Sequence, residues 1–314
     1  MGSKIPLIVV CGPTASGKTG LAVELAKIYD GEVISADSMQ IYKGLNIATA
    51  KPTQSEMSGV PHHLIDFLEP EQKFSVADYL PLARDCIEDI HSRGKQPVIC
   101  GGTGLYISSL INNVRFDEIR SDPELRARLE FEYKEKGAEY MWERLNEIDP
   151  ETAAAVHQNN APRVIRGIEV YTLTGKTLSQ LKKESIVDKS NYDACIIGLH
   201  FTNRQMLYDR INKRVDDMIQ DGLVKECRKV YDSCQLETAY QAIGYKELIP
   251  YFKGNKSLDE CVEHIKQETR HYAKRQLTWF RRMEGVNWAD PSESNNFENF
   301  LRNVRKIIAK SIIL

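Results

Sequence analysis

One octapeptide near the N-terminus constrains the fold of this chain more than any other feature. It reads Gly12-Pro13-Thr14-Ala15-Ser16-Gly17-Lys18-Thr19 and matches G-x-x-x-x-G-K-[ST] in full, between an apolar run at 5–10 and a helical pattern at 21–28. Strand, glycine-rich turn and helix in this order form a P-loop, whose backbone N–H groups cradle an anion at the helix N-terminus. The motif predicts a di- or triphosphate site, with Lys18 on the terminal phosphate and Thr19 as a Mg²⁺ ligand. Its expected phosphate-binding residues are Gly12, Thr14, Ala15, Ser16, Gly17, Lys18 and Thr19.

Short apolar runs rich in β-branched residues recur along the chain, and helical patterns separate them. Runs at 32–35, 97–100 and 192–201 are typical of strands buried on both faces. Residues 75–92 predict a long helix that Ser75 opens. Alternation of strand and helix predicts an α/β fold with a parallel sheet, and ligands bind such sheets at the carboxyl ends of the strands.

The middle of the chain has a different character. Residues 122–184 are rich in Glu, Arg, Lys, Leu and Ala and contain no buried-strand pattern. We therefore expect two parts. A P-loop NTPase-like core, with a parallel sheet flanked by helices, comprises 1–112 and 191–314, and an all-helical insertion domain comprises 113–190.

Composition excludes several classes of protein. The 314 residues carry a net charge of −2 and seven scattered cysteines without a C-x-x-C pair, so neither a disulfide framework nor a zinc ribbon is indicated. No apolar run approaches the roughly 20 residues that span a bilayer, and the N-terminal apolar run is too short for a signal peptide. We expect a cytoplasmic, monomeric protein with reduced thiols and no membrane partner.

Basic residues gather in one late segment. Apolar residues recur at helical spacing in 205–232 and 257–283, and 264–282 holds six Lys or Arg residues against one acidic residue. Aromatic residues alternate with these cations, a combination that fits an RNA backbone surface. We expect the apolar side of this helix, with its aromatic residues, to be buried and the basic side to face RNA.

The partners that a nucleotide-hydrolysing P-loop requires are weak or missing. The nearest Walker B candidate, 33–37, is a short apolar strand that ends in Asp37. No D-x-x-G occurs, and the aspartate after Asn212-Lys213 comes one residue too late for the guanine-reading N-K-x-D. The sequence therefore argues against a GTPase switch.

Eight segments together resemble one family, the tRNA dimethylallyltransferases, in the family's order. They are GPTASGKT at 12–19, SADSMQIYKGLNIATAKP at 35–52, GVPHHLIDFLEP at 59–70, GGTGLY at 101–106, APRVIRGIEVY at 161–171, GLVKE at 222–226, QAIGYKE at 241–247 and YAKRQLTWFRR at 272–282. The resemblance implies transfer of a dimethylallyl group from dimethylallyl diphosphate to N6 of the adenosine immediately 3′ of the anticodon, with Mg²⁺ as cofactor. The tRNAs would be those reading codons that begin with U. The lack of a cysteine-rich zinc finger after the core favours the bacterial type.

The resemblance implies catalytic roles for Asp37 and Thr103. Asp37 would accept the proton that N6 loses as the C–N bond forms, since an aspartate is ionised at neutral pH. A Mg²⁺ ligand and a helix cap are the alternative roles of Asp37. Thr103 would donate to the bridging oxygen of the diphosphate or to the base, or else cap the helix after the GGTG turn.

Arginines in the insertion are the expected RNA contacts there. Arg163 and Arg166, three apart on a helical face, suit phosphates and unstacked bases, or else form ion pairs with Glu169. Arg126 touches RNA or pairs with Glu130.

Four positions in the last third of the chain complete the expected contacts. Arg210 and Arg214, four apart on one helical face, reach the diphosphate or stay solvated. Gln241 and Lys246 stand where some family members carry arginines. The full set expected to contact tRNA is Asp37, Ser38, Met39, Gln40, Thr103, Arg126, Pro162, Arg163, Arg166, Gln241, Gly244 and Lys246.

Two rival functions stand beside prenyl transfer. One is a small-molecule P-loop kinase that uses ATP, with the insertion as a lid, and the other is a nucleotide-dependent RNA-binding protein without turnover. In the main interpretation, core and insertion grip the tRNA anticodon stem-loop, and the target base leaves its stack to meet Asp37.

Overall fold

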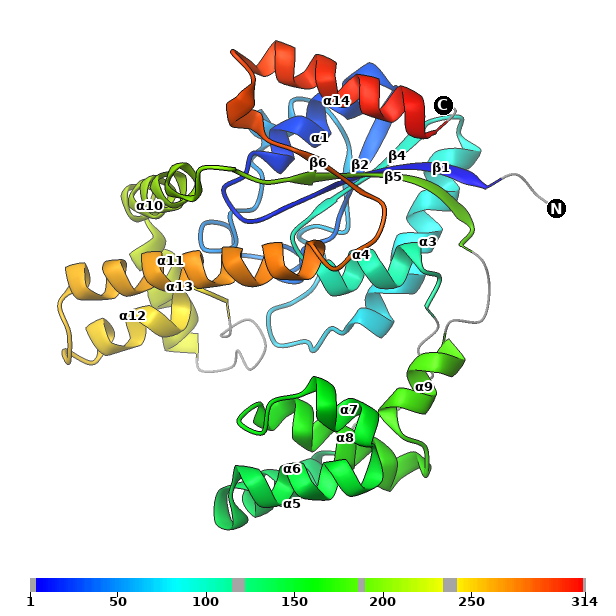
Figure 1. Cartoon of the computed structure of the whole chain (residues 1–314). Coiled ribbons are helices and arrows are strands. Elements are labelled where there is room, and N and C mark those ends of the chain that lie inside the picture. Colours follow the sequence, from blue (N-terminus) through cyan, green and yellow to red (C-terminus); the bar gives the residue numbers. More distant parts are fainter. Residues whose placement is uncertain (1–3, 115–121, 186–189, 234–241, 313–314) are drawn as a thin grey trace. The chain divides into compact units, whose positions relative to one another are not determined.

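The computed structural model describes residues 4–114, 122–185, 190–233 and 242–312 (Figure 1). It divides into two compact units. Residues Met1–Ile111 with Ser190–Leu314 form the first, which we call the core, and Asn112–Lys189 form the second, which we call the insertion. Among the described residues, no helix is both long enough and apolar enough to cross a membrane.

The described part of the core contains one parallel sheet of six strands, in the order β3-β2-β4-β1-β5-β6. The expected α/β architecture is confirmed. Sequence patterns missed the two edge strands, because two and four residues are too few to show a periodicity. The strands are β1 (Ile5–Cys11), β2 (Gly31–Ser35), β3 (His62–His63), β4 (Gln96–Gly101), β5 (Tyr192–Leu199) and β6 (Val286–Ala289).

Helices cover both faces of this sheet (Figure 1). Alternate side chains of β1 explain why: Ile8 and Val10 pack with α1 and α14, whereas Leu7 and Val9 pack with α3 and α4. The core helices are α1 (Lys18–Ile28), α2 (Gln54–Met57), α3 (Val76–Ser92), α4 (Gly104–Ile111), α10 (Arg204–Gln220), α11 (Leu223–Ser233), α12 (Tyr245–Phe252), α13 (Leu258–Phe280) and α14 (Phe297–Ser311), with the 3₁₀ turn η2 (Pro291–Glu293).

Two sequence patterns in the core correspond to helices of the structure. Ser75 opens α3 as predicted, through a reciprocal capping box with Asp78. The helical spacing in 205–232 corresponds to two helices, α10 and α11, which Asp221 and Gly222 separate.

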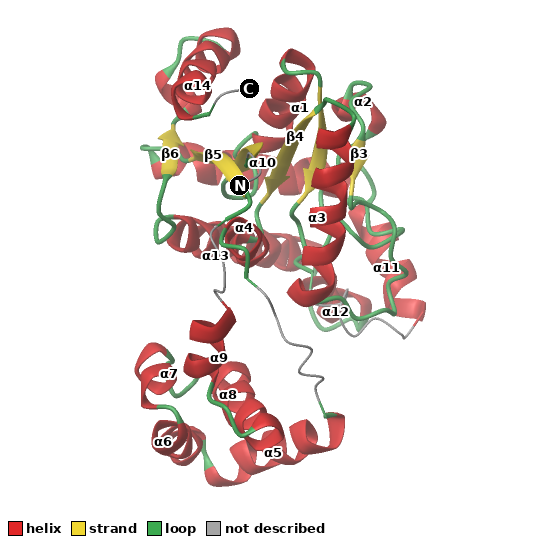
Figure 2. Ribbon diagram, turned by 90° about the vertical axis from the view of Figure 1, so that its right-hand side faces the viewer, coloured by secondary structure: helices red, strands yellow, loops and turns green. Residues whose placement is uncertain are grey.

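The described residues of the insertion form helices without any strand, as Figure 2 shows. Asp122 and Asp149 each cap a helix that begins with proline, so these boundaries follow from local sequence. Leu129, Leu145 and Ile168 lie in a separate apolar cluster of the insertion. Its helices are α5 (Pro123–Lys136), α6 (Ala138–Ile148), α7 (Pro150–Ala155), α8 (Ala161–Thr174) and α9 (Leu178–Ser185).

Candidate active site

Three neighbouring strands of the sheet end side by side, and each continues into one of the singled-out motifs. In the parallel register Cys11 of β1 pairs with Gly101 of β4, and Ser35 of β2 pairs with Cys100 of β4. The P-loop, the segment that begins at Ala36 and the 102–104 turn therefore emerge at one edge of the sheet. This is the carboxyl edge, where parallel sheets bind ligands.

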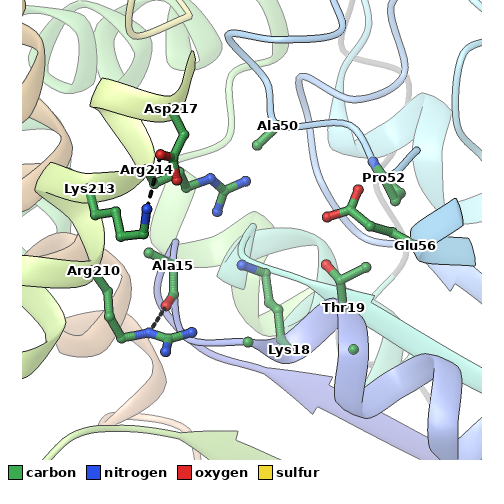
Figure 3. Close-up of a pocket in the computed structure, with 12 residues that line it drawn as sticks. Ala15, Lys18, Thr19, Ala50, Pro52, Glu56, Arg210, Lys213, Arg214 and Asp217 are labelled. Atoms are coloured by element: carbon green, nitrogen blue, oxygen red, sulfur yellow. Dashed lines mark hydrogen bonds and ion pairs between the residues drawn. The ribbon is translucent and has the colours of Figure 1, made fainter. Parts of the chain in front are cut away.

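The P-loop leads into a pocket of about 410 Å³ that α10 completes. Figure 3 shows Lys18 and Thr19 of the P-loop lining it together with Arg210 and Arg214 of α10. The hydroxyl of Ser16 is buried beside them, with no hydrogen-bond partner in the described chain. Cations gathered around one cavity, next to the P-loop that carries this hydroxyl, favour a phosphate-bearing ligand.

Both α10 arginines point at the P-loop. Nε of Arg210 donates to the carbonyl oxygen of Ala15 at 2.8 Å, and Nη1 of Arg214 donates to the hydroxyl of Thr14 at 3.3 Å. Both arginines line the pocket beside the P-loop, where Arg214 is half-buried and Arg210 is exposed to solvent.

Burial disfavours the charged forms of two cations in the pocket, Lys18 and Arg214. Burial lowers the pKa of Lys18 below its ordinary value, and the charge of Arg214 lowers it further. Burial is also the main cause of the lowered pKa of Arg214. Two cations whose charged forms are disfavoured by burial will gain stabilisation from an anion placed between them.

Asp37 follows β2 and shapes its own turn. Its Oδ1 accepts the backbone N–H groups of Met39 at 2.9 Å and Gln40 at 3.3 Å, a capping arrangement at a bend and not at a helix. The described residues make no further hydrogen bond to this carboxylate. Burial first, and then the negative charge of Asp37, raise the pKa of Tyr272, which places the carboxylate near α13.

Thr103 binds the segment that carries Asp37. Its Oγ1 accepts the N–H of Ser38 at 3.0 Å and lies 3.4 Å from the Ser38 hydroxyl, while its own N–H donates to Ala36 at 3.1 Å. A helix cap would accept an amide of α4 through its side chain. In the described chain the side-chain oxygen of Thr103 instead accepts the amide of Ser38.

Gln40 also reaches the pocket wall. Its Nε2 donates to the carbonyl oxygens of Thr49 at 3.2 Å and Ala50 at 3.1 Å, and Ala50 lines the pocket. Met39 lies at the edge of the apolar cluster that contains Tyr245.

Glu226 is a site-supporting residue that sequence reasoning did not single out. From the first turn of α11 its carboxylate accepts the consecutive amides of Asn46, Ile47 and Ala48 at 2.9–3.1 Å and the hydroxyl of Tyr245 at 2.8 Å. Three N–H groups on one carboxylate hold the chain just before Ala50. The sequence signal that could have drawn attention to Glu226 was its position in the GLVKE motif, which does not indicate its hydrogen-bond partners.

Two of the expected tRNA contacts, Gly244 and Lys246, lie at the start of α12. Gly244 is buried, and its N–H donates to Glu247 at 2.7 Å, which starts α12. Lys246 is exposed and its Nζ lies 3.7 Å from Glu247. Gln241 lies outside the described residues.

In the insertion, one buried carboxylate organises two of the expected arginines. Glu169 is fully buried, and its Oε2 accepts Arg126 at 2.7 Å and Arg166 at 2.8 Å. The expected pairing of Arg126 with Glu130 is wrong, because the carboxylate of Glu169 lies within hydrogen-bond reach of its guanidinium. Pro162 and Arg163 are exposed, and no described acidic residue pairs with Arg163.

Among the described residues, some cations in the basic stretch of α13 form ion pairs and others do not. Lys266 pairs with Asp216 and Glu263, whereas Lys274 and Arg275 are exposed without an ion pair to any described residue. The expectation that the aromatic residues of this helix are buried is confirmed for Phe280, whereas Trp279 is 37% exposed even though its ring lies against the buried Gly104.

Known proteins match this chain over almost its whole length. A family model described as IPP transferase matches residues 40–283, and one described as isopentenyl transferase matches residues 5–69. The tRNA dimethylallyltransferase of Acetivibrio thermocellus is 50% identical over 96% of this chain and 97% of its own length. That of Bacillus subtilis is 50% identical over 92% and 91%.

Two solved structures share the fold. The full-length tRNA isopentenylpyrophosphate transferase from Bacillus halodurans superposes with a TM-score of 0.74 at 44% identity, covering 98% of this chain and 97% of that one. A eukaryotic dimethylallyltransferase acting on tRNA gives a TM-score of 0.80 at 29% identity, covering 98% and 81%.

Proposed function

The chain belongs to the tRNA dimethylallyltransferase family, and on that premise we propose that it transfers a dimethylallyl group from dimethylallyl diphosphate to N6 of the adenosine immediately 3′ of the anticodon. The tRNAs are those reading codons that begin with U. The observation that carries the proposal is that the P-loop after β1 and Asp37 after β2 emerge at the same edge of the sheet, on the two strands that flank β4. We also propose that the reaction takes place in the cytoplasm, as a tRNA substrate supports.

The phosphate side of the site serves the leaving group. A bond forms between N6 and the first carbon of the dimethylallyl group, and the bond from that carbon to the diphosphate oxygen breaks. Negative charge then grows on the departing diphosphate. The site is arranged to stabilise this growing charge more strongly than the charge on the intact donor. The stabilising groups are the P-loop amides, Lys18, Arg210 and Arg214.

The other side of the site serves the nucleophile. An exocyclic amine on adenine must lose a proton as the C–N bond forms, and Oδ2 of Asp37, which accepts no hydrogen bond from the residues that the structure describes, is available to accept it. The amides of Met39 and Gln40 hold Oδ1 and fix the carboxylate orientation. Thr103 keeps Ser38 in place beside it, and the target base leaves its stack to enter.

The residues present fit a Mg²⁺ ion. Thr19 lines the pocket with the carboxylates of Glu56 and Asp217, and Mg²⁺ usually takes few protein oxygens together with substrate phosphates and water. Thr19 would hold the ion, which supplies charge neutralisation to the diphosphate when bound.

Interaction with tRNA is proposed for exposed cations of both units. Arg163 in the insertion, together with Lys274 and Arg275 on α13, offers charge without an acidic partner in the described chain. Arg126 and Arg166 share the buried carboxylate of Glu169, and both are also proposed to contact tRNA.

The decisive experiment compares substrates. Purified protein is incubated with dimethylallyl diphosphate and unmodified tRNA, or with ATP and nucleosides, and the nucleosides are analysed by mass spectrometry. We expect one prenylated adenosine per tRNA and none in a control tRNA whose target adenosine is replaced by guanosine, which lacks the N6 amine. ATP consumption without prenylation would favour the kinase alternative, and tRNA binding without turnover would favour the RNA-binding alternative.

A further inference from the structure

The side chain of Gln276 joins the two loops that form the site. Its Oε1 accepts the backbone N–H of Thr14 in the P-loop at 2.9 Å, and its Nε2 donates to the carbonyl oxygen of Gly102 at 3.0 Å. Gln276 is 5% exposed, so both hydrogen bonds form away from bulk water. A side-chain amide is neutral, and it can accept from one loop through its oxygen while it donates to the other through its nitrogen.

The 102–104 turn fits closely against α13. A Cβ atom on Gly102 would lie 2.1 Å from Nε2 of Gln276, and one on Gly104 would lie 2.2 Å from the ring of Trp279. A side chain at either position would therefore displace Gln276 or Trp279 of α13. Gln276 and Trp279, three residues apart, hold the turn from one helix face.

The 102–104 turn also fixes the segment that carries Asp37, the proposed base. Thr103 lies between the two glycines, and it bonds Ala36 through its N–H and Ser38 through its hydroxyl oxygen. Asp37 lies between these two bonded residues. A displacement of the turn would therefore be passed to Asp37.

We propose that Gln276 is a positioning residue for prenyl transfer, which sets the separation between the loop that cradles the leaving diphosphate and the segment that presents Asp37. The inference rests on the proposed function. Transfer between two bound substrates depends steeply on the distance and alignment of the reacting atoms, and a misplacement of about 1 Å can cost roughly 10²-fold in rate. A residue that ties both loops to one rigid helix supplies that alignment without touching either substrate.

Two substitutions separate the two hydrogen bonds. Gln276→Glu keeps an acceptor for Thr14 but loses the donor to Gly102, whereas Gln276→Met keeps the length of the side chain and loses both bonds. Gln267→Met, at an exposed position of the same helix, is the matched control. Each variant is assayed in single turnover with both substrates saturating, together with the donor KM and the tRNA Kd.

We expect the single-turnover rate to fall in the order wild type, Gln276→Glu, Gln276→Met, reaching about 10²-fold, while the donor KM and tRNA Kd change by far less. The control should match the wild type. A rise in KM with an unchanged rate, or a rate loss equal to the fraction of unfolded protein, would reduce Gln276 to a structural contact and overturn the proposal. If Gln276→Met fails to fold, Gln276→Glu decides the question by the same criteria.

A readout without chemistry separates this proposal from the proposed function. Hydrogen exchange at the Thr14 amide should be slow in the wild type and fast in Gln276→Met. A wild type that never prenylates tRNA would refute the proposed function even if this difference were seen. An active wild type whose Thr14 exchange and rate are both unaffected by Gln276→Met would refute the positioning role alone.

Discussion

Arg214 donates from Nη1 to the hydroxyl of Thr14 at 3.3 Å, although 200 residues separate the two in the sequence. The contact brings a late helix of the chain onto its first loop. A phosphate cradle that local sequence predicts as a strand, a turn and a helix is thus completed from α10. The site consequently carries more positive charge than the P-loop motif alone supplies.

Removing the proposed base should slow the chemical step selectively. Asp37→Asn keeps the shape of the side chain and can still accept amides through its carbonyl oxygen, but it is a far weaker proton acceptor. We expect the single-turnover rate to fall by about 10²–10⁴ at nearly constant tRNA affinity. Asp193→Asn, at an exposed position on β5, is the control. Full activity in Asp37→Asn would remove Asp37 from the mechanism.

Donor binding should depend on pH through Lys18. Burial lowers the pKa of its ammonium group below the ordinary value of 10.5, so the free protein loses this charge at a lower pH than a solvated lysine does. A bound diphosphate favours the protonated form. We therefore expect affinity for inorganic diphosphate to fall as the pH rises, with proton uptake on binding in alkaline buffer, measured by calorimetry.

Replacing Lys18 tests whether this side chain causes the pH dependence of diphosphate binding. Lys18→Met should weaken diphosphate binding by about 1.5–3 kcal/mol at neutral pH and remove the proton uptake, because the titrating group is gone. Lys27→Met, on the exposed side of the same helix, should retain both. Proton uptake that persists in Lys18→Met would assign the titration to another group.

Glu226 should control the order of the pocket wall. A glutamine at this position offers one acceptor oxygen and no charge to the amides of residues 46–48. We expect Glu226→Gln to weaken protection of these amides by on the order of 1.5–3 kcal/mol in hydrogen exchange. Asp232→Asn, near the end of the same helix, should leave them unchanged. Equal protection in both variants would contradict this role.

Acid stability should depend on Glu32, which is remote from the pocket. Its carboxylate accepts Arg93 at 2.6 and 2.8 Å and also contacts His63 at 2.7 Å and Lys95 at 3.2 Å. The hydrogen bonds from Arg93 are the main cause that holds the pKa of Glu32 far below its ordinary value of 4.5. The unfolded chain therefore takes up a proton below pH 4.5 that the folded chain does not.

Because the pKa of Glu32 is lower in the folded chain than in the unfolded chain, stability should change with pH in one direction. Stability from Glu32 is complete above pH 4.5 and decreases as the pH falls below it. The free energy of unfolding should fall more steeply in the wild type than in Glu32→Gln, by at most about 1.4 kcal/mol per pH unit, in denaturant titrations. Glu71→Gln, at an exposed position, should behave like the wild type. Parallel curves for wild type and Glu32→Gln would contradict the assignment.

Salt dependence should reveal how a protein of net charge −2 binds a polyanion. Each phosphate that a cation neutralises releases condensed counterion, so tRNA affinity should fall steeply with salt. Lys274→Ala or Arg275→Ala should weaken all tRNAs alike and lower the log–log salt slope by about 1. Lys310→Ala on α14 is the control.

Base-reading contacts should behave differently in the same salt series. If Arg163 contacts unstacked bases of the anticodon loop, Arg163→Ala should reduce discrimination between a substrate and a non-substrate tRNA by about 1–3 kcal/mol. A flat salt response in the wild type would place the RNA elsewhere on the protein.

Much of the architecture follows from local sequence. The P-loop, the capped start of α3 at Ser75 and the proline-opened helices of the insertion depend on residues a few positions apart, whose backbone preferences and side-chain caps act within one turn. Buried apolar runs likewise predicted the central strands, because a strand covered on both faces must be apolar throughout. The short edge strands lacked that pattern and went unrecognised.

Tertiary structure decided which polar groups meet. Spacing along one helix suggested Glu130 as the partner of Arg126, but the folded insertion brings the buried carboxylate of Glu169 to it from another helix. Gln276 showed no signal of its own, because one glutamine on a helix reveals nothing until the strands bring Thr14 and Gly102 to either side of it. Local preferences act over a few residues and are written in the sequence, whereas hydrogen bonds between distant segments exist only after packing has set the distances.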